Sequence, residues 1–352
     1  MAPLTAKALL IGSGACARRI AEDILTQASD LIIASTGENF GLSTTPVSID
    51  TAEERARIYT QTKVNSCQGT VGDFKVALEH NGEKRTAAVD QIIIAEDEKR
   101  IADFSSYGLT RTDRVMALSE LKKLLSEVSE DDSLFSGIKT VVFLVGIDVE
   151  SNPVILEEIM QSCLKLQVEH KRKIYILTAN LKVAANGLEK LYRDTKDAGV
   201  FYIKFTHTRP DIIQVTDGRV FFEFTDEITG IRLNLPADLT IVDENFVPSD
   251  YSADLALIFE LEQDLYGFTQ ADNVHRLTVL TNRKGILVAG PARSVQSLPD
   301  QFADADNALL SLRNIEKQPA DQTADKAQIE NGKCVRCLTC YRLCPYRAIQ
   351  VN

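Results

Sequence analysis

The chain has 352 residues, a length that predicts two domains with room for a small appendage. Its 44% apolar and 25% charged residues are typical of a globular protein and exclude disordered and collagen-like classes. The net charge of −11 repels phosphate backbones and argues against a role in nucleic-acid binding. The apolar run at 141–145 is far shorter than the roughly 20 residues of a membrane span, and the N-terminal stretch lacks a secretory pattern. We therefore expect a cytoplasmic protein with no membrane span.

A dinucleotide-binding pattern opens the chain. Residues 8–11 predict a buried strand, and the turn at 12–17 has the form G-x-G-x-x-A before an apolar-faced helix and a second strand at 31–33. This order places a helix N-terminus and bare backbone N–H groups against a pyrophosphate. Alternating apolar residues and the Asn-Gly pair at 81–82 then predict a hairpin, followed by a strand at 92–95.

The same order recurs about 130 residues later. A strand at 140–145, a helix from 153 and a strand at 174–177 precede a hairpin at 212–224 and a last strand at 238–242. The repeat predicts two Rossmann-like dinucleotide-binding units in an α/β fold.

The remaining segments complete a predicted division into four parts. A turn and strand at 281–290 and a helix at 298–312 have no partner in the second copy, so we expect them to return to the first. The polar, proline-interrupted stretch that follows is typical of a tether. The expected parts are residues 1–137 with 240–312 as the first unit, 138–239 as an inserted unit, 313–326 as a linker, and 327–352 as a small metal-binding unit.

Four cysteines crowd into this last part. Cys334, Cys337, Cys340 and Cys344 follow the C-x-x-C-x-x-C-x-x-x-C-P spacing of bacterial ferredoxins, in which a tight loop brings three thiolates onto one iron–sulfur cluster. Zinc sites usually separate paired knuckles by a longer loop or use histidine, and no histidine lies near this run. A disulfide framework would need an oxidising compartment. The spacing therefore predicts one [4Fe–4S] cluster.

Two ligand sets remain open for that cluster. In two-cluster ferredoxins the Cys-Pro cysteine ligates the other cluster, and this chain contains a single run. Either all four cysteines hold one cluster, or three hold it and Cys344 reaches toward a cluster on a partner chain. The cations around the run could raise the reduction potential or dock an acidic electron donor, or they form an ordinary solvated surface; they are Lys333, Arg336, Arg342 and Arg347.

The other cysteines are expected to be structural. Cys163 continues an apolar helical stripe from Ile155 and Ile159, which favours a buried free thiol. Cys16 stands at a helix start, where the pKa of a thiol is lowered, although packing against the turn is the simpler interpretation. No nucleophile–base pair is evident, so hydrolytic chemistry is not predicted.

Together these features resemble the flavoprotein A subunit of heterodisulfide reductase and its relatives, whose core is similar to thioredoxin reductase. The segments that carry the resemblance span nearly the whole chain: the Gly12/Gly14 turn, 69–76, 103–108, 115–121, 174–177, 187–192, 198–200, 285–290 and the cysteine tail. The resemblance implies an FAD-type unit, an inserted NAD(P)-type unit and a ferredoxin-type tail. It assigns FAD, where retained, to Gly12, Gly14, Ala17, Glu38, Gly285, Ala289 and Gly290.

The sequence also departs from that family. Residues 34–36 lack the acid that normally holds the adenosine ribose, so Glu38 would have to take this role. The run 95–97, Ala-Glu-Asp, replaces the family's Ala-Thr-Gly and puts a carboxylate where backbone should approach the cofactor. The second unit has only Gly146 followed by acids within 148–150, so NAD(P) is not expected and this unit is predicted to be vestigial.

Three interpretations follow. The leading one is an electron-transfer subunit of a multi-subunit anaerobic oxidoreductase, whose cluster relays single electrons on a degenerate scaffold. The alternative is an active FAD-dependent oxidoreductase subunit, electron-bifurcating as in some relatives. The third is a structural adaptor whose cluster only stabilises the tail. The resemblance implies other subunits of a heterodisulfide reductase-like complex, ferredoxin-type donors or acceptors, and a larger oligomer.

Overall fold

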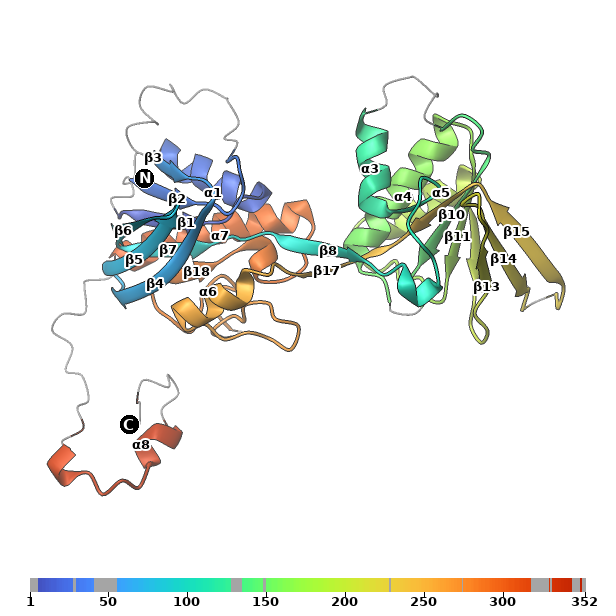
Figure 1. The fold of residues 1–352 in the computed structure, drawn as a ribbon. Helices are drawn as coiled ribbons and strands as arrows, with labels where there is room; N and C mark the ends of the chain where they lie inside the picture. The colour runs from blue at the N-terminus through green and yellow to red at the C-terminus, as the bar shows by residue number, and fades with distance from the viewer. Residues whose placement is uncertain are drawn as a thin grey trace. The chain divides into compact units, whose positions relative to one another are not determined.

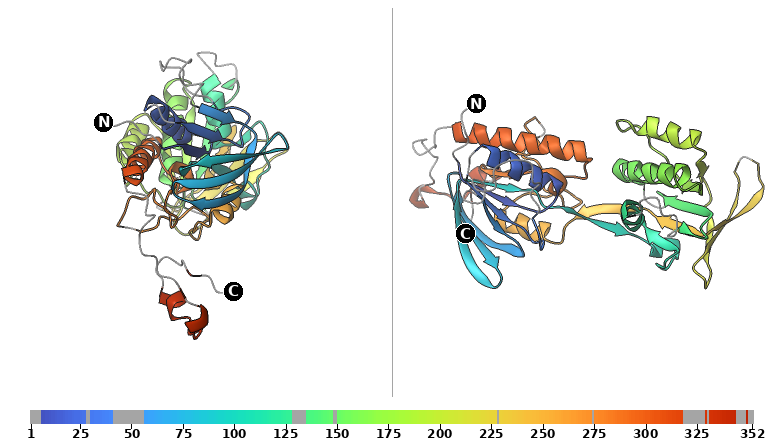
Figure 2. Two further views of the ribbon diagram at one scale, coloured as in Figure 1. Left: turned by 90° about the vertical axis from the view of Figure 1, so that its left-hand side faces the viewer. Right: turned by 90° about the horizontal axis from the view of Figure 1, so that it is seen from above.

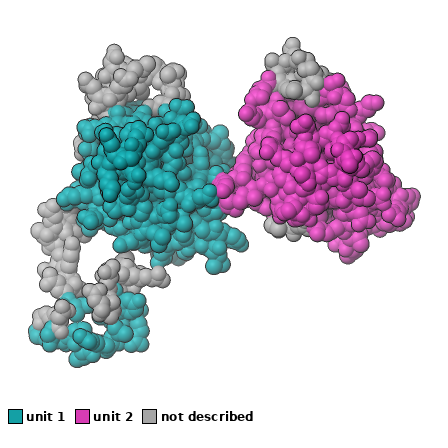
Figure 3. Space-filling view, in the orientation of Figure 1, with its two compact units in different colours: residues 1–98, 248–352 teal, residues 99–247 magenta. Residues whose placement is uncertain are grey.

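The computed structural model of the protein describes residues 6–27, 30–40, 56–127, 135–147, 150–227, 229–273, 275–317, 329, 331–343 and 349. The chain forms two compact units, residues 1–98 with 248–352 and residues 99–247 (Figure 3). The sequence placed these divisions at 137/138 and 239/240. They lie elsewhere because β9 (Val115–Ala117) pairs in parallel with β16 (Leu239–Val242), so segments on both sides of the expected borders join the second unit's sheet.

A five-stranded parallel sheet forms the centre of the first unit. Its order is β18 (Ile286–Val288), β7 (Gln91–Ile94), β1 (Ala8–Ile11), β2 (Leu31–Ala34) and β3 (Ala56–Tyr59) (Figure 1). Strands β1, β2, β7 and β18 are buried along their whole length, which explains why they are continuous apolar runs.

Different elements cover the two faces of this sheet. Helices α1 (Ala15–Thr26) and α7 (Leu298–Lys317) lie side by side on one face, where their small residues pack closely (Figure 2). The other face packs against α6 (Ser252–Phe259) and a three-stranded antiparallel sheet of β4 (Thr62–Thr70), β5 (Asp73–His80) and β6 (Glu83–Val89). Asn81 and Gly82, with φ of 51° and 80°, make the predicted hairpin turn between β5 and β6.

The second unit repeats this plan. Its parallel sheet has the order β12 (Phe201–Lys204), β11 (Lys173–Thr178), β10 (Thr140–Val145), β16 and β9, and its antiparallel sheet the order β13 (Asp211–Gln214), β14 (Val220–Thr225) and β15 (Arg232–Ala237). Helices α3 (Leu118–Glu127), α4 (Pro153–Val168) and α5 (Leu188–Asp197) accompany the parallel sheet. The chain passes between the units through the paired strands β8 (Glu98–Ala102) and β17 (Glu244–Pro248). The duplicated organisation predicted from the sequence is therefore present.

Local signals explain where α4 begins. Asn152 precedes the helix and its side-chain oxygen accepts a hydrogen bond of 2.9 Å from the Val154 N–H, while Pro153 occupies the first turn. Cys163 is fully buried beside Ile155 and Ile159 as the stripe predicted. In the described part of the chain, no helix combines the length and apolarity needed to cross a membrane.

Candidate cofactor and metal sites

The glycine turn after β1 is packed against the chain's own atoms. Gly12 has φ of 137°, and a Cβ built there would lie 2.0 Å from the carbonyl oxygen of Ala95, which follows β7. Gly14 precedes α1, and a Cβ there would lie 1.8 Å from a carboxylate oxygen of Asp97. Gly12 is thus required by the neighbouring strand, and Gly14 leaves room for an aspartate.

A second carboxyl group lies at the same edge of the sheet. Glu96 is 6% exposed, and one of its oxygens lies 3.5 Å from the Thr36 hydroxyl, which follows β2 on the other side of β1. Its second oxygen has no hydrogen-bond partner among the described residues. Burial, together with the nearby Asp97, raises the pKa of Glu96 to about 7. Burial also raises the pKa of Asp97, whereas Arg18 acts to lower it.

The end of β18 completes this edge. Gly290 donates its N–H to Asp304 at 3.1 Å, and a Cβ at Gly290 would lie 2.7 Å from the Cys16 sulfur. Cys16 is fully buried, and its thiol donates to the Gln301 carbonyl oxygen at 3.4 Å. Burial raises the pKa of Cys16 to about 12, with Asp304 adding to the effect. The simpler interpretation of Cys16, packing against the turn, therefore holds, and burial outweighs any lowering of the thiol pKa at the helix start.

The structure brings together most of the residues to which FAD was assigned. Ala17 is buried within α1, Ala289 is buried after β18, and Glu38 is exposed beyond β2. Gly285 is the exception: it precedes β18, its carbonyl accepts from the Ile92 N–H, and a Cβ there would lie 2.8 Å from Val71. Because β18 runs parallel to its neighbours, residues before and after it lie at opposite edges of the sheet.

This arrangement decides how the first unit fits FAD. In a Rossmann site the second glycine lets the pyrophosphate approach the backbone at the helix N-terminus. Here the Asp97 carboxylate stands against that glycine, with both oxygens and the carboxyl carbon within 2.3 Å of the Cβ position. As folded, the residues of the turn do not fit a pyrophosphate.

In the second unit, residues 148 and 149 of the corresponding turn lie outside the described residues, and the described contact at this turn is made by Asp243. Asp243, which follows β16, accepts the Gly146 N–H at 2.8 Å. Burial raises the pKa of Asp243 to about 6, although the hydrogen bonds from Gly146 and Ser151 act to lower it. A cavity of about 170 Å³ beside Tyr107, Ile147 and Arg209 is smaller than the roughly 300 Å³ at which ligand pockets begin.

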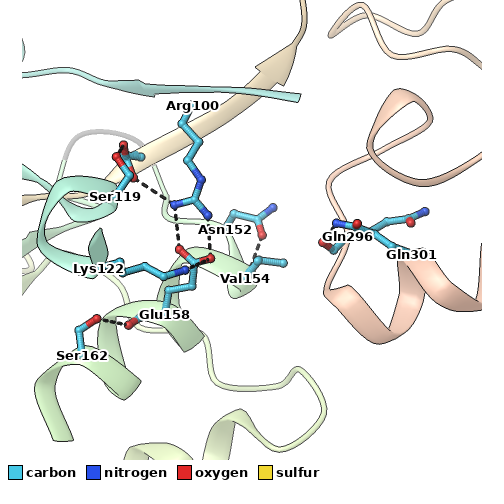
Figure 4. A network of polar contacts seen from close by, with 10 residues as sticks. Arg100, Ser119, Lys122, Asn152, Val154, Glu158, Ser162, Gln296 and Gln301 are labelled. Carbon is cyan, nitrogen blue, oxygen red and sulfur yellow. Dashed lines mark hydrogen bonds and ion pairs between the residues drawn. The ribbon is translucent and has the colours of Figure 1, made fainter. Parts of the chain in front are cut away.

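Next to Asp243, a partly buried ion-pair network joins four elements of the second unit. Arg100 on β8 makes two hydrogen bonds to Glu158 on α4, of 2.7 and 2.9 Å (Figure 4). It makes a third, of 3.2 Å, to Glu244. Lys122 on α3 reaches the same Glu158 at 2.6 Å. Glu244 also accepts the backbone N–H and the hydroxyl of Ser119 in the first turn of α3, at 2.9 and 2.7 Å. The network supplies partners to the buried Glu244 and to the partly buried Glu158.

Asp243, Glu244 and this network were not predicted from the sequence. A signal for them was present, since Ile-Ile-Ala-Glu-Asp at 93–97 and Thr-Ile-Val-Asp-Glu at 240–244 both end a buried strand with two acids. Arg100 and Glu158 lie 58 positions apart, and only the fold brings them together.

The cysteine segment differs from both turns because its thiols are exposed. Cys334, Cys337 and Cys340 are free and exposed. Cys334 and Cys337 lie between a short 3₁₀ turn, η4 (Asn331–Lys333), and α8 (Thr339–Leu343), and Cys340 lies in the first turn of α8; Cys344 lies outside the described residues. Arg336 and Leu338, on either side of Cys337, have φ of 54° and 59°, so the backbone bends sharply at this cysteine.

Further contacts prepare Cys337 as a ligand. Thr339 hydrogen-bonds to its sulfur and lowers the pKa of the thiol. Arg342 donates to the Cys337 carbonyl oxygen at 2.8 Å. Across the described ranges, no three metal-ligating side chains are gathered at one point, so we expect the cluster itself to draw the loop together. The thiol donors, their exposure and the bent backbone fit an iron–sulfur cluster.

Comparison with known proteins agrees with this assignment. Residues 327–350 match the family model described as a 4Fe-4S binding domain. The chain is 30% identical over 166 residues to the A subunit of ferredoxin:CoB-CoM heterodisulfide reductase of Methanosarcina acetivorans, covering 47% of this chain and 20% of that protein. It is 26% identical to the iron-sulfur A subunit of CoB-CoM heterodisulfide reductase of Methanocaldococcus jannaschii, covering 52% and 28%. The matches thus span between a fifth and three tenths of these relatives.

Solved structures with the same fold cover most of the chain. Thioredoxin reductase of T. acidophilum superimposes with a TM-score of 0.56 and 15% identity, over 90% of this chain and all of that one. Putidaredoxin reductase, in its covalent complex with putidaredoxin, gives a TM-score of 0.53 at 14% identity, over 90% and 77%. At these identities the likeness concerns the fold.

The fold and the cysteine segment together define the class of protein to which this chain belongs. The chain has a thioredoxin-reductase-like α/β fold of two Rossmann-type units and a ferredoxin-type segment for a [4Fe–4S] cluster, as predicted. The predicted resemblance to the family of heterodisulfide reductase A subunits is also confirmed, over about half of the chain. These features define an iron–sulfur redox protein.

Proposed function

We propose that the chain is an electron-transfer component of a multi-subunit oxidoreductase. A [4Fe–4S] cluster held by Cys334, Cys337, Cys340 and Cys344 accepts and passes on one electron at a time. The two-unit body serves as the scaffold on which redox partners dock. The observation that carries this proposal is the exposure of the three described thiols on a bent, cation-bearing segment, in a chain whose glycine turns are filled by its own acids.

The partners follow from the relatives' names. These relatives are A subunits of CoB-CoM heterodisulfide reductases, one of them ferredoxin-dependent by name. We extend this to the present chain as membership of a heterodisulfide reductase-like complex that exchanges electrons with iron–sulfur or ferredoxin-type proteins. Free thiols suit a reducing compartment such as the cytoplasm. In the alternative ligand set, three cysteines hold this cluster, its remaining ligand comes from elsewhere, and Cys344 reaches toward a cluster on a partner chain.

The active flavoenzyme is the less favoured function. It requires a pyrophosphate at Gly14, where the Asp97 carboxylate stands. A structural adaptor would also hold a cluster, and it differs from a relay in redox behaviour alone.

The test is an anaerobic reduction assay on the full chain with its cluster. We expect about four irons per chain and bleaching of the cluster's visible absorption when a reduced ferredoxin is added. Reoxidation by an artificial one-electron acceptor should restore the band. A cluster that ferredoxin cannot reduce would support the structural adaptor, and an iron count near eight would contradict the single-cluster assignment.

A further inference from the structure

The two glycine turns share an unexpected feature. In each unit, the strand beside the first strand of the parallel sheet ends in a pair of acids, Glu96–Asp97 after β7 and Asp243–Glu244 after β16. We propose that the chain's own carboxylates close both dinucleotide-type turns, so that neither unit holds a dinucleotide phosphate.

The two acid pairs lie at the same edge of the repeated fold, but they are offset by one residue, because Asp243 makes the bond that Ala95 makes in the first unit. The Ala95 N–H donates to the Ile11 carbonyl at the end of β1, at 2.7 Å. The Asp243 N–H donates to the Leu144 carbonyl near the end of β10, at 3.2 Å. Both acid pairs therefore leave the sheet at the carboxyl edge next to the first strand, where doubly wound folds bind their ligands.

In the first unit the closure is steric and electrostatic. The Asp97 carboxylate fills the space in front of Gly14, and a phosphate brought there would meet a like charge in a buried setting. Glu96 extends from β7 across the end of β1 to Thr36, over the path that the ribose would take. Two carboxyl groups therefore occupy the same edge, Asp97 in front of Gly14 and Glu96 beside Thr36.

In the second unit, Asp243 accepts the backbone N–H that a phosphate would need. The Gly146 N–H, which would otherwise be available to a phosphate, already bonds to Asp243. Glu244 is held by Arg100 and by the first turn of α3. That two copies of the fold reach the same result through different contacts indicates a property of this chain rather than one accidental side-chain position.

A consequence concerns the electrons, and it rests on the proposed function. Flavins and nicotinamides carry the hydride and two-electron chemistry of this fold. A chain that holds neither exchanges electrons through its iron–sulfur cluster alone, and therefore singly. Two-electron steps of the complex would belong to other subunits.

The test titrates the full, cluster-loaded chain with ADP and with FAD by calorimetry. The variants are Asp97→Gly, which removes bulk and charge at Gly14, and Asp97→Asn, which removes the charge alone. We expect no saturable binding by the native chain and at least about a tenfold gain in ADP affinity for Asp97→Gly. Asp97→Asn should show a smaller gain because the bulk remains. Glu83→Gln, an exposed charge removal in the same unit, should behave as the native chain.

Several results would overturn the proposal. About one FAD bound per native chain would do so directly, whatever the variants show. A folded Asp97→Gly chain that binds ADP no better than the native chain would remove the role of the carboxylate. If Asp97→Gly does not fold, the ADP affinity of Asp97→Asn and the FAD content of the native chain test the proposal instead.

A separate titration tests the second unit. The Asp243→Ala chain should bind NADH more tightly than the native chain, because the Gly146 N–H is released. No gain in a folded chain would contradict closure there. Failure of the proposed function would instead appear as a cluster that ferredoxin does not reduce, which these titrations do not measure.

Discussion

The glycine turns of the two units and the cysteine run of the tail are both sequence patterns typical of cofactor binding, but the fold treats them in opposite ways. Gly14 and Gly146 follow buried strands in the pattern that nucleotide sites use, but the chain's own carboxylates already contact both glycines. Around Cys337 the backbone turns sharply, yet the sulfur atoms face outward. A glycine pattern reports a tight turn and close backbone approach, and it does not say what approaches. A run of cysteines supplies the cluster ligands themselves, so its spacing predicts a metal site whatever residues the fold places around it.

The largest expected effect removes the cluster. Cys337→Ser should reduce the iron content from about four per chain to near zero, because a bent loop that loses one thiolate cannot hold the cubane. Unfolding of the two units should be unchanged, since the described cysteines of this run are exposed. Iron and sulfide assays with urea unfolding measure both. Cys67→Ser is the matched control and should keep its iron; equal iron in Cys337→Ser would show that the ligands lie elsewhere.

The rate of thiol alkylation should differ between the cysteine run and the buried cysteines of the two units, and no mutation is needed to measure it. In the cluster-free chain we expect Cys337 to be alkylated at least about 100-fold faster than Cys16 or Cys163, because burial raises the pKa of the latter two and excludes the reagent. Mass spectrometry of timed iodoacetamide labelling gives the rates. Fast labelling of Cys16 would mean that the turn around Gly290 opens in solution.

The partly buried network offers a test of how strongly the second unit depends on its acids. Glu158→Ala leaves Arg100 with a single carboxylate partner in a half-buried site, and we expect the free energy of unfolding to fall by about 2–3 kcal/mol. Glu189→Ala breaks an exposed pair with Arg193 in the same unit and should lower it by less than about 0.5 kcal/mol. Urea titration measures both, and equal losses would show that the network adds nothing to an ordinary surface pair.

A smaller, pH-dependent effect is expected at Glu96. Its pKa is about 7 in the folded chain and about 4.3 when unfolded, so the folded state holds a proton that the unfolded state releases between these values. Stability of the first unit should therefore fall as the pH rises through this window. Glu96→Gln should flatten that fall and stabilise the unit by about 2 kcal/mol at pH 8, with little change near pH 4.

Urea unfolding across this range measures the effect. Glu83→Gln, an exposed acid on β6, is the control and should retain the native pH profile. An unchanged profile in Glu96→Gln would mean that this carboxyl titrates as an ordinary exposed one.

Much of the fold could be predicted because its signals are local. The apolar runs of β1, β7 and β10, the Asn81–Gly82 turn and the Asn152–Pro153 helix start each depend on neighbouring residues alone. The unit borders could not be predicted this way, because β9 joins a sheet through a strand more than 100 residues away. Gly285 was misplaced for a similar reason, since strand direction decides which edge of the sheet a residue reaches.

The sequence by itself determined the iron–sulfur segment, since its ligands lie within eleven residues and their spacing sets the loop. It also determined the repeated α/β pattern, through hydrophobic periods that each element carries alone. Only the tertiary structure decided what faces each glycine turn. Asp97 lies 83 positions from Gly14 and Asp243 lies 97 from Gly146, and parallel pairing of β1 with β7 and of β10 with β16 brings them together. Such contacts follow from strand order and register, which no local pattern encodes.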